Sequence, residues 1–125
     1  MSLANAFVEV SLTSSNPEGS KSFYTEKLGL KEVPTEEGAL MYEAGNGTRI
    51  FIYNSGAPKA TNTVASFKVG NVLDEVNELK GKGVEFESYD MGQIKTDENN
   101  IVKMGDLEAA WFKDPDGNIL CVSNH

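Results

Sequence analysis

The order of strands and helices that the sequence predicts occurs twice, and this repeat constrains the fold more than any other feature. Each copy begins with a strand and continues with a helix that follows a capping asparagine, Asn16 in one copy and Asn71 in the other. A similar segment lies where each helix ends, Gly-Leu-Lys-Glu-Val at 29–33 and Gly-Val-Glu-Phe-Glu at 83–87. Three strands follow in each copy. Two unrelated α+β halves are the alternative, but the shared landmarks favour one βαβββ unit that is present twice.

The two copies fit in one domain, because 125 residues can bury a single hydrophobic core. We expect an α+β fold over residues 1–125, with module one at about 6–54 and module two at about 62–124. A segment with Gly56 and Pro58 reads as the linker between them. The predicted strands are 7–13, 30–35, 39–44 and 48–54 in module one, and 63–69, 84–89, 109–113 and 119–123 in module two, with a short strand near 101–103 in the polar segment 90–105.

The last two strands form the most clearly specified hairpin. Asp114-Pro115-Asp116-Gly117 has the chemistry of a tight turn, because Pro presets φ and Gly accepts the left-handed conformation. A three-residue loop there pairs Asp114 with Asn118 and sets Trp111 opposite Cys121.

The strands of module one that flank Asn46-Gly47 form a second predicted hairpin. Asn-Gly is the strongest short hairpin signal, and it favours a two-residue turn. Such a turn would set Tyr42 opposite Phe51.

Charge and composition exclude several classes of function. A net charge of −8 argues against nucleic acid and anionic membrane as partners. No apolar run approaches the ~20 residues of a membrane-spanning helix. The single Cys121 cannot form an intramolecular disulfide, which suits a cytoplasmic location. The single histidine, His125, excludes Ser-His-Asp and Cys-His catalysis and any multi-histidine metal cluster.

Two segments resemble the vicinal oxygen chelate superfamily of glyoxalases, bleomycin-resistance proteins and extradiol dioxygenases. One is Ser22-Phe23-Tyr24 followed by Leu28-Gly29-Leu30, and the other is Trp111-Phe112-Lys113-Asp114-Pro115-Asp116-Gly117-Asn118. With the repeated βαβββ order, the resemblance covers nearly all of residues 6–124. It implies that the two modules curl into a cup-shaped mixed sheet, with helices outside and a ligand inside. In this superfamily dimerisation often completes the cup.

The resemblance also implies where a metal would bind, and this chain departs from that pattern. The family's four ligand positions fall on Glu9, Phe51, Val64 and Cys121. Phe51 and Val64 cannot ligate a metal, and two remaining ligands are fewer than the three or four that a stable zinc site needs. We therefore expect no metal and no other cofactor.

Strand alternation, starting from Glu9, indicates which side chains line the cup. For the aromatic members the alternative is ordinary core packing, and for Glu9 it is an ion pair with Arg49 or Lys68. Cys121 reads as a small buried group rather than a nucleophile, because no histidine is near it in sequence to activate it. The candidate ligand-binding residues are Glu9, Tyr42, Arg49, Phe51, Tyr53, Lys68, Trp111 and Cys121.

A concave, largely aromatic pocket with one carboxylate is typical of a small-molecule site. We expect a cytoplasmic homodimer that binds a small aromatic or cationic molecule without a metal, with Trp111 as the wall and Glu9 as the polar anchor. The first alternative is a lyase, isomerase or dioxygenase-type enzyme in which Glu9 is the base or a metal ligand. The second is a subunit that dimerises and has no chemistry of its own.

Overall fold

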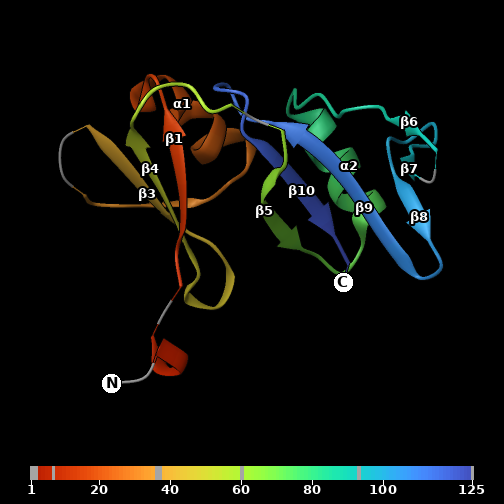
Figure 1. Cartoon of the computed structure of the whole chain (residues 1–125), viewed down its shortest axis with the longest axis horizontal. Helices are drawn as coiled ribbons and strands as arrows, with labels where there is room; N and C mark the ends of the chain where they lie inside the picture. The colour runs from red at the N-terminus through yellow and green to blue at the C-terminus, as the bar shows by residue number, and fades with distance from the viewer. Residues whose placement is uncertain (1–2, 7, 36–37, 60, 93, 125) are drawn as a thin grey trace. The chain divides into compact units, whose positions relative to one another are not determined.

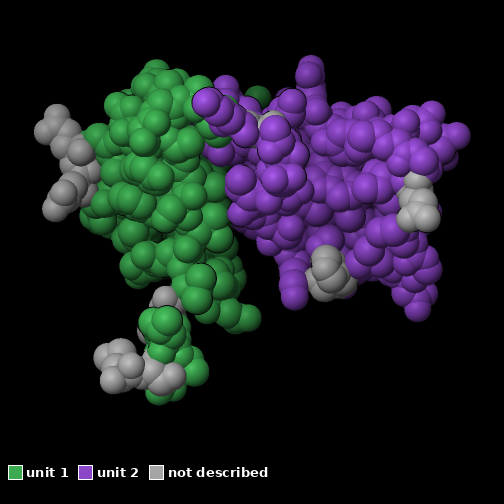
Figure 2. All heavy atoms as spheres, viewed as in Figure 1, with its two compact units in different colours: residues 1–58 green, residues 59–125 purple. Residues whose placement is uncertain are grey.

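The computed structural model describes residues 3–6, 8–35, 38–59, 61–92 and 94–124. The chain divides into two compact units, Met1–Pro58 and Lys59–His125, shown in green and purple in Figure 2. Each unit contains a four-stranded mixed sheet of its own, and the predicted α+β class is confirmed. Among the described residues, no helix is long and apolar enough to cross a membrane.

Unit 1 contains a sheet with the strand order β1-β4-β3-β2 (Figure 1). Strand β1 runs parallel to β4, and the other two pairs are antiparallel. The helix begins at Pro17, whose fixed φ suits the first helical position, and its last part is a π-helical turn. The elements are η1 (Leu3–Asn5), β1 (Val10–Ser14), α1 (Pro17–Ser22), η2 (Phe23–Lys27), β2 (Lys31–Val33), β3 (Ala39–Glu43), η3 (Gly45–Gly47) and β4 (Arg49–Asn54).

The core of unit 1 lies between the sheet and α1, which packs on β3 and β4. Alternate residues of the strands are buried on this side, namely Leu12, Leu40, Tyr42, Ile50 and Ile52. The intervening residues lie on the other face of the sheet, where Phe51 is half-buried and Tyr53 is exposed. The Phe51 and Tyr53 rings stack there with their centroids 5.9 Å apart.

The loop between β3 and β4 is one residue longer than predicted. The Ala44 N–H donates to the Thr48 carbonyl at 2.8 Å, and this pair closes a three-residue loop, Gly45–Gly47. Asn46 and Gly47 both have positive φ, 55° and 77°. Both residue types tolerate that conformation, so the Asn-Gly signal located the loop correctly although the predicted loop length was wrong.

The extra loop residue reverses the predicted orientation of Tyr42. Ile50 lies opposite Tyr42, and Met41 lies opposite Phe51. Because a one-residue shift moves a side chain to the other face of a sheet, the prediction that Tyr42 and Phe51 share the cup face is wrong. Tyr42 is fully buried on the helix side and stacks on Tyr24, with ring centroids 5.6 Å apart.

Unit 2 contains a second four-stranded sheet, with the order β5-β10-β9-β8. Strand β5 runs parallel to β10, and the remaining pairs are antiparallel. Helix α2 packs on β9 and β10, and β6 and β7 form a separate small hairpin. The elements are β5 (Thr63–Lys68), α2 (Val72–Gly81), β6 (Asp90–Met91), β7 (Ile94–Lys95), β8 (Val102–Met104), β9 (Leu107–Lys113) and β10 (Ile119–Ser123).

The C-terminal hairpin has the predicted register. The Asp114 N–H donates to the Asn118 carbonyl at 3.0 Å, and Gly117 has a φ of 97°. Trp111 lies directly opposite Cys121. The turn residues therefore determine the face of the sheet on which Trp111 lies.

Three predicted strands differ clearly from the observed ones, and one of them, predicted at residues 30–35, is observed only at Lys31–Val33. The first strand of the chain, predicted at residues 7–13, is observed at Val10–Ser14, so Glu9 precedes the strand, and Phe7 lies outside the described residues. The segment predicted as strand 84–89 pairs with β9 only through an isolated bridge between Phe86 and Phe112. The polar segment 90–105 contains three short strands, of which only β8 was predicted.

The two predicted helix caps also differ. The Asn71 side-chain carbonyl accepts the Asp74 N–H at 3.0 Å, as a cap does. Asn16 occupies the N-cap position but makes no side-chain cap hydrogen bond. Its amide instead lies beside Gly19, where a Cβ atom would come within 2.7 Å of the Asn16 nitrogen.

Candidate functional site

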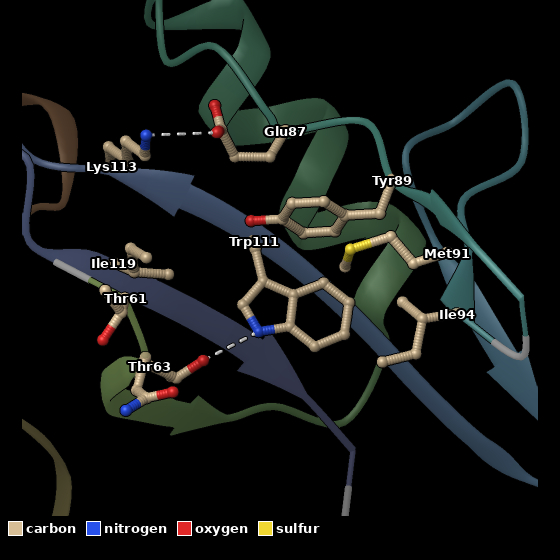
Figure 3. Close-up of a pocket in the computed structure, with 10 residues that line it drawn as sticks. Thr61, Thr63, Glu87, Tyr89, Met91, Ile94, Trp111, Lys113 and Ile119 are labelled. Atoms are coloured by element: carbon tan, nitrogen blue, oxygen red, sulfur yellow. Dashed lines mark hydrogen bonds and ion pairs between the residues drawn. The ribbon is translucent and has the colours of Figure 1, made fainter.

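A pocket of about 380 Å³ lies within unit 2 (Figure 3). Its residues come from the start of β5, from β9 and β10, and from the segment between α2 and β7. The residues that line it are Thr61, Asn62, Thr63, Glu87, Tyr89, Met91, Ile94, Trp111, Lys113 and Ile119.

Trp111 forms a wall of this pocket (Figure 3). Its neighbours along β9, Ala110 and Phe112, are fully buried, so alternation places the half-buried indole on the other face of the sheet. The indole N–H donates to the Thr63 hydroxyl at 3.0 Å, which links β9 to β5. The hydrogen bond fixes the ring plane and satisfies its only donor. A ligand would therefore meet the indole as an apolar surface.

Tyr89 meets the indole edge to face, with ring centroids 5.6 Å apart and an interplanar angle of 70°. Thr96 fixes the Tyr89 backbone, because its hydroxyl accepts the Tyr89 N–H and its own N–H donates to the Tyr89 carbonyl, both at 2.9 Å. Burial raises the pKa of the Tyr89 phenol, and the nearby Glu87 carboxylate raises it further. At neutral pH the phenol is therefore protonated and can donate a hydrogen bond.

The small hairpin beyond Tyr89 adds apolar surface. Met91 and Ile94 lie on it, and both line the pocket. The Met91 side chain is 62% exposed. An exposed, flexible thioether beside aromatic rings can adapt to the shape of a ligand.

Glu87 and Lys113 form an ion pair at the edge of the pocket, away from Met91 and Ile94 (Figure 3). The Lys113 ammonium and the Glu87 carboxylate are 3.6 Å apart and are both partly exposed. The Glu87 N–H donates to the Trp111 carbonyl at 2.8 Å. This backbone hydrogen bond holds the ion pair close to the indole.

Cys121 lies opposite Trp111, but its side chain is buried in the sheet. Desolvation raises the pKa of the Cys121 thiol, although a hydrogen bond with Ser66 lowers it in part. The thiol is therefore neutral at pH 7, which agrees with its interpretation as a small buried group rather than a nucleophile.

Two of the predicted site residues of module one, Glu9 and Arg49, line a different pocket, in unit 1. This pocket has a volume of about 530 Å³, and Val8, Glu9, Gly47 and Arg49 line it. The Arg49 guanidinium pairs with the Glu43 carboxylate at 3.3 Å, and the alternative of an ion pair between Glu9 and Arg49 or Lys68 stays a prediction. That Glu9 and Trp111 face one common space stays a prediction.

Lys68 is exposed on β5, next to Ser123 of β10. It is not among the residues that line either of the two pockets.

Sequence reasoning missed most of the residues around Trp111. Tyr89, Met91 and Ile94 come from a segment that was read as strand and loop, and no periodicity pointed to them. Lys113 could have been found, since residues two apart on a strand share a face and Lys113 follows Trp111 by two. Glu87 would then have followed as its partner.

The described residues do not fit the metal site that the family resemblance implies. Among them there is no group of three or more His, Cys, Asp and Glu side chains that could hold a metal ion. Phe51 and Val64 offer no ligand atoms at two of the four family positions. The described side chains of one chain therefore do not by themselves supply the ligand set that the resemblance implies.

A comparison with protein families identifies one family. Residues 6–122 match the Glyoxalase/Bleomycin resistance protein/Dioxygenase superfamily. The structure is similar to UcmS2, with a TM-score of 0.72 and 19% identity, over 95% of this chain and 97% of that one.

It is also similar to a glyoxalase family protein from Enterococcus faecalis, with a TM-score of 0.70 and 21% identity, over 98% of this chain and 99% of that one. A lactoylglutathione lyase from Agrobacterium tumefaciens matches with a TM-score of 0.64 and 18% identity, over 95% of this chain and 92% of that one. These likenesses concern the fold. No curated protein sequence matches the chain. Because the family match spans nearly the whole sequence, the chain belongs to the Glyoxalase/Bleomycin resistance protein/Dioxygenase superfamily.

Proposed function

We propose that this protein binds a small, flat organic molecule in the Trp111 pocket and needs no metal ion to do so. The observation that carries the proposal is the fixed indole, whose N–H bonds to Thr63 while the ring lines a pocket of about 380 Å³. That volume lies within the ~300–1,000 Å³ of ordinary ligand pockets. A ring stacked on the indole gains about 0.5–1.5 kcal/mol beyond its buried area.

The charges at the pocket favour a neutral ligand over a cation. Glu87 is the carboxylate that lines it, and Lys113 lies 3.6 Å from that carboxylate. The local charge is therefore balanced, even though the chain as a whole carries −8. The acidic protein as a whole would attract a cation, but the Lys113 ammonium in the pocket would repel it.

The enzymatic alternative assigns a general base to Glu9. Its supporting observation is that Glu9 and Arg49 line the second pocket, in unit 1. We give it second place because that pocket has no aromatic wall among its described residues. Glu9→Gln separates the two functions, since it should abolish a reaction at Glu9 and leave binding at Trp111 unchanged.

A fluorescence titration tests the proposal, because Trp111 is the only tryptophan in the chain. Quinoline, a neutral flat bicycle, should change the Trp111 emission in a saturable manner, and calorimetry on the same samples should give the same affinity. Trp111→Leu should weaken the affinity by about 10-fold by calorimetry, a loss of about 1.4 kcal/mol. The matched control is Phe51→Leu on the sheet of unit 1. Equal affinity in the wild type and Trp111→Leu would contradict the proposal.

We also propose that the protein is a cytoplasmic homodimer. Each sheet, taken by itself, ends in two edge strands, β1 and β2 in unit 1 and β5 and β8 in unit 2. Edge strands present unpaired backbone groups that proteins usually cover. Light scattering at micromolar concentration should give twice the 13.6 kDa chain mass, and a mass near that of one chain would contradict the dimer.

A further inference from the structure

We propose that the Glu87–Lys113 ion pair selects ligands whose flat ring carries a hydrogen-bond donor and an acceptor side by side on one edge, as a cyclic amide does. The inference rests on the proposed function, since it names the class of molecule that the Trp111 pocket takes.

The ion pair is placed to meet the edge of a ring that stacks on Trp111. Lys113 follows Trp111 by two residues on β9, so both side chains leave the same face of the strand, about 7 Å apart along it. The Glu87 N–H donates to the Trp111 carbonyl, and this hydrogen bond holds Glu87 next to the part of β9 that carries Trp111 and Lys113. Figure 3 shows the two charged groups pointing toward each other beside the indole.

The ion pair is loose enough to exchange partners. Its atoms are 3.6 Å apart, whereas a direct charge-assisted hydrogen bond is about 2.7–2.9 Å long. Both side chains are partly exposed, Lys113 by 48% and Glu87 by 32%, and exposed pairs contribute little to stability. A ligand can therefore replace the mutual contact with a contact to each group.

A cyclic amide offers the complementary edge. Its N–H would donate to the Glu87 carboxylate, and its carbonyl would accept from the Lys113 ammonium. A quinoline lacks the donor, and a quaternary N-methylquinolinium lacks both groups and adds a positive charge next to Lys113. Met91 and Ile94, which line the pocket away from this ion pair, would contact the apolar part of the ring system.

Three probes of similar size test the inference: 2-quinolone, quinoline and N-methylquinolinium. For the wild type, 2-quinolone should bind at least about 10-fold more tightly than quinoline, since hydrogen bonds to charged groups are the stronger kind. N-methylquinolinium should bind no better than quinoline. Calorimetry gives the three affinities under one condition of salt and pH.

Variants identify the groups responsible. Glu87→Gln should reduce the preference for 2-quinolone over quinoline to about threefold or less, because it removes the charge that meets the amide N–H. Lys113→Met should weaken the binding of 2-quinolone, because it removes the ammonium that donates to the amide carbonyl. Glu85→Gln and Lys103→Met remove the same charges from exposed positions in the same unit, and should keep the full preference. Circular dichroism on all four variants confirms that each is folded.

Each outcome decides the inference. The inference is supported if Glu87→Gln loses the preference for 2-quinolone, Lys113→Met binds 2-quinolone more weakly, and the two control variants behave as the wild type does. Equal affinities for 2-quinolone and quinoline would overturn it and leave the proposed function standing. Tightest binding of N-methylquinolinium would overturn it as well, because Glu87 would then act as a simple anionic site. If none of the three probes binds, the proposed function fails and this inference fails with it.

Discussion

Replacing Asp114 with alanine should destabilise unit 2 by about 3 kcal/mol, because the carboxylate organises the C-terminal hairpin from inside. One oxygen, Oδ1, accepts the N–H groups of Asp116 at 3.0 Å and Asn118 at 2.9 Å. The other, Oδ2, accepts the Asn118 side-chain amide at 2.9 Å. Asp114 and Asn118 are only 5% and 2% exposed. Truncation therefore removes an acceptor that water cannot readily replace.

The magnitude follows from the donors that lose this acceptor. Two belong to the buried Asn118, and each orphaned buried donor costs about 1–3 kcal/mol. The third belongs to the half-buried Asp116, whose N–H can form a hydrogen bond with water instead. The sum of the two Asn118 terms is about 2–6 kcal/mol, and partial relaxation of the loop favours the lower half of that range.

Urea unfolding followed by Trp111 fluorescence measures the change, since the tryptophan lies on a strand of the same hairpin. Asp106→Ala is the matched control, because it removes the same charge from an exposed position in the same unit. It should shift the free energy of unfolding by no more than about 0.5 kcal/mol. A loss below about 1 kcal/mol for Asp114→Ala at unchanged m-value, or an equal loss for Asp106→Ala, would refute the reasoning.

Further predictions concern the caps, a buried phenol and metal content. Asn71→Ala should cost about 1 kcal/mol of unfolding free energy, and Asn16→Ala less than half of that, because only Asn71 caps its helix through its side chain; equal losses in urea unfolding would contradict this. Desolvation raises the pKa of Tyr42 in the folded state, so its contribution to stability is complete below about pH 10 and is lost as pH rises toward the folded pKa. The stability of the wild type should therefore fall toward that of Tyr42→Phe above pH 10, and a constant difference would contradict the expectation. Elemental analysis after dialysis should find no stoichiometric zinc, nickel, iron or manganese, because Phe51 and Val64 replace two family ligands, and close to one metal per chain would refute it.

The sequence predicted strand register correctly where the turn residues allow only one loop geometry. Pro115 and Gly117 determine a three-residue loop, and the register of Trp111 against Cys121 follows from that loop and is confirmed. At the other hairpin, Asn46-Gly47 is compatible with loops of two and of three residues. Since one residue of register decides the face of a strand, Tyr42 was assigned to the wrong side of the sheet.

The candidate site was only partly predictable for a related reason. Trp111 lies on a regular strand next to a specific turn, so its register and its role as a candidate ligand-binding residue could be predicted. Tyr89, Met91 and Ile94 lie on a short irregular hairpin whose place beside the indole depends on backbone bonds between Tyr89 and Thr96. Neither periodicity nor composition encodes such a contact, so it emerges only from the folded chain.

The most direct test of the central claim is the NMR signal of the Trp111 indole N–H, the only such signal that this sequence can give. In an ¹⁵N-labelled sample titrated with 2-quinolone, that signal and the amides of Glu87 and Tyr89 should shift along one saturation curve, while the amides of Glu9 and Arg49 stay in place. A stationary indole signal, together with saturable shifts at Glu9 and Arg49, would contradict the account and move the ligand site to the pocket in unit 1.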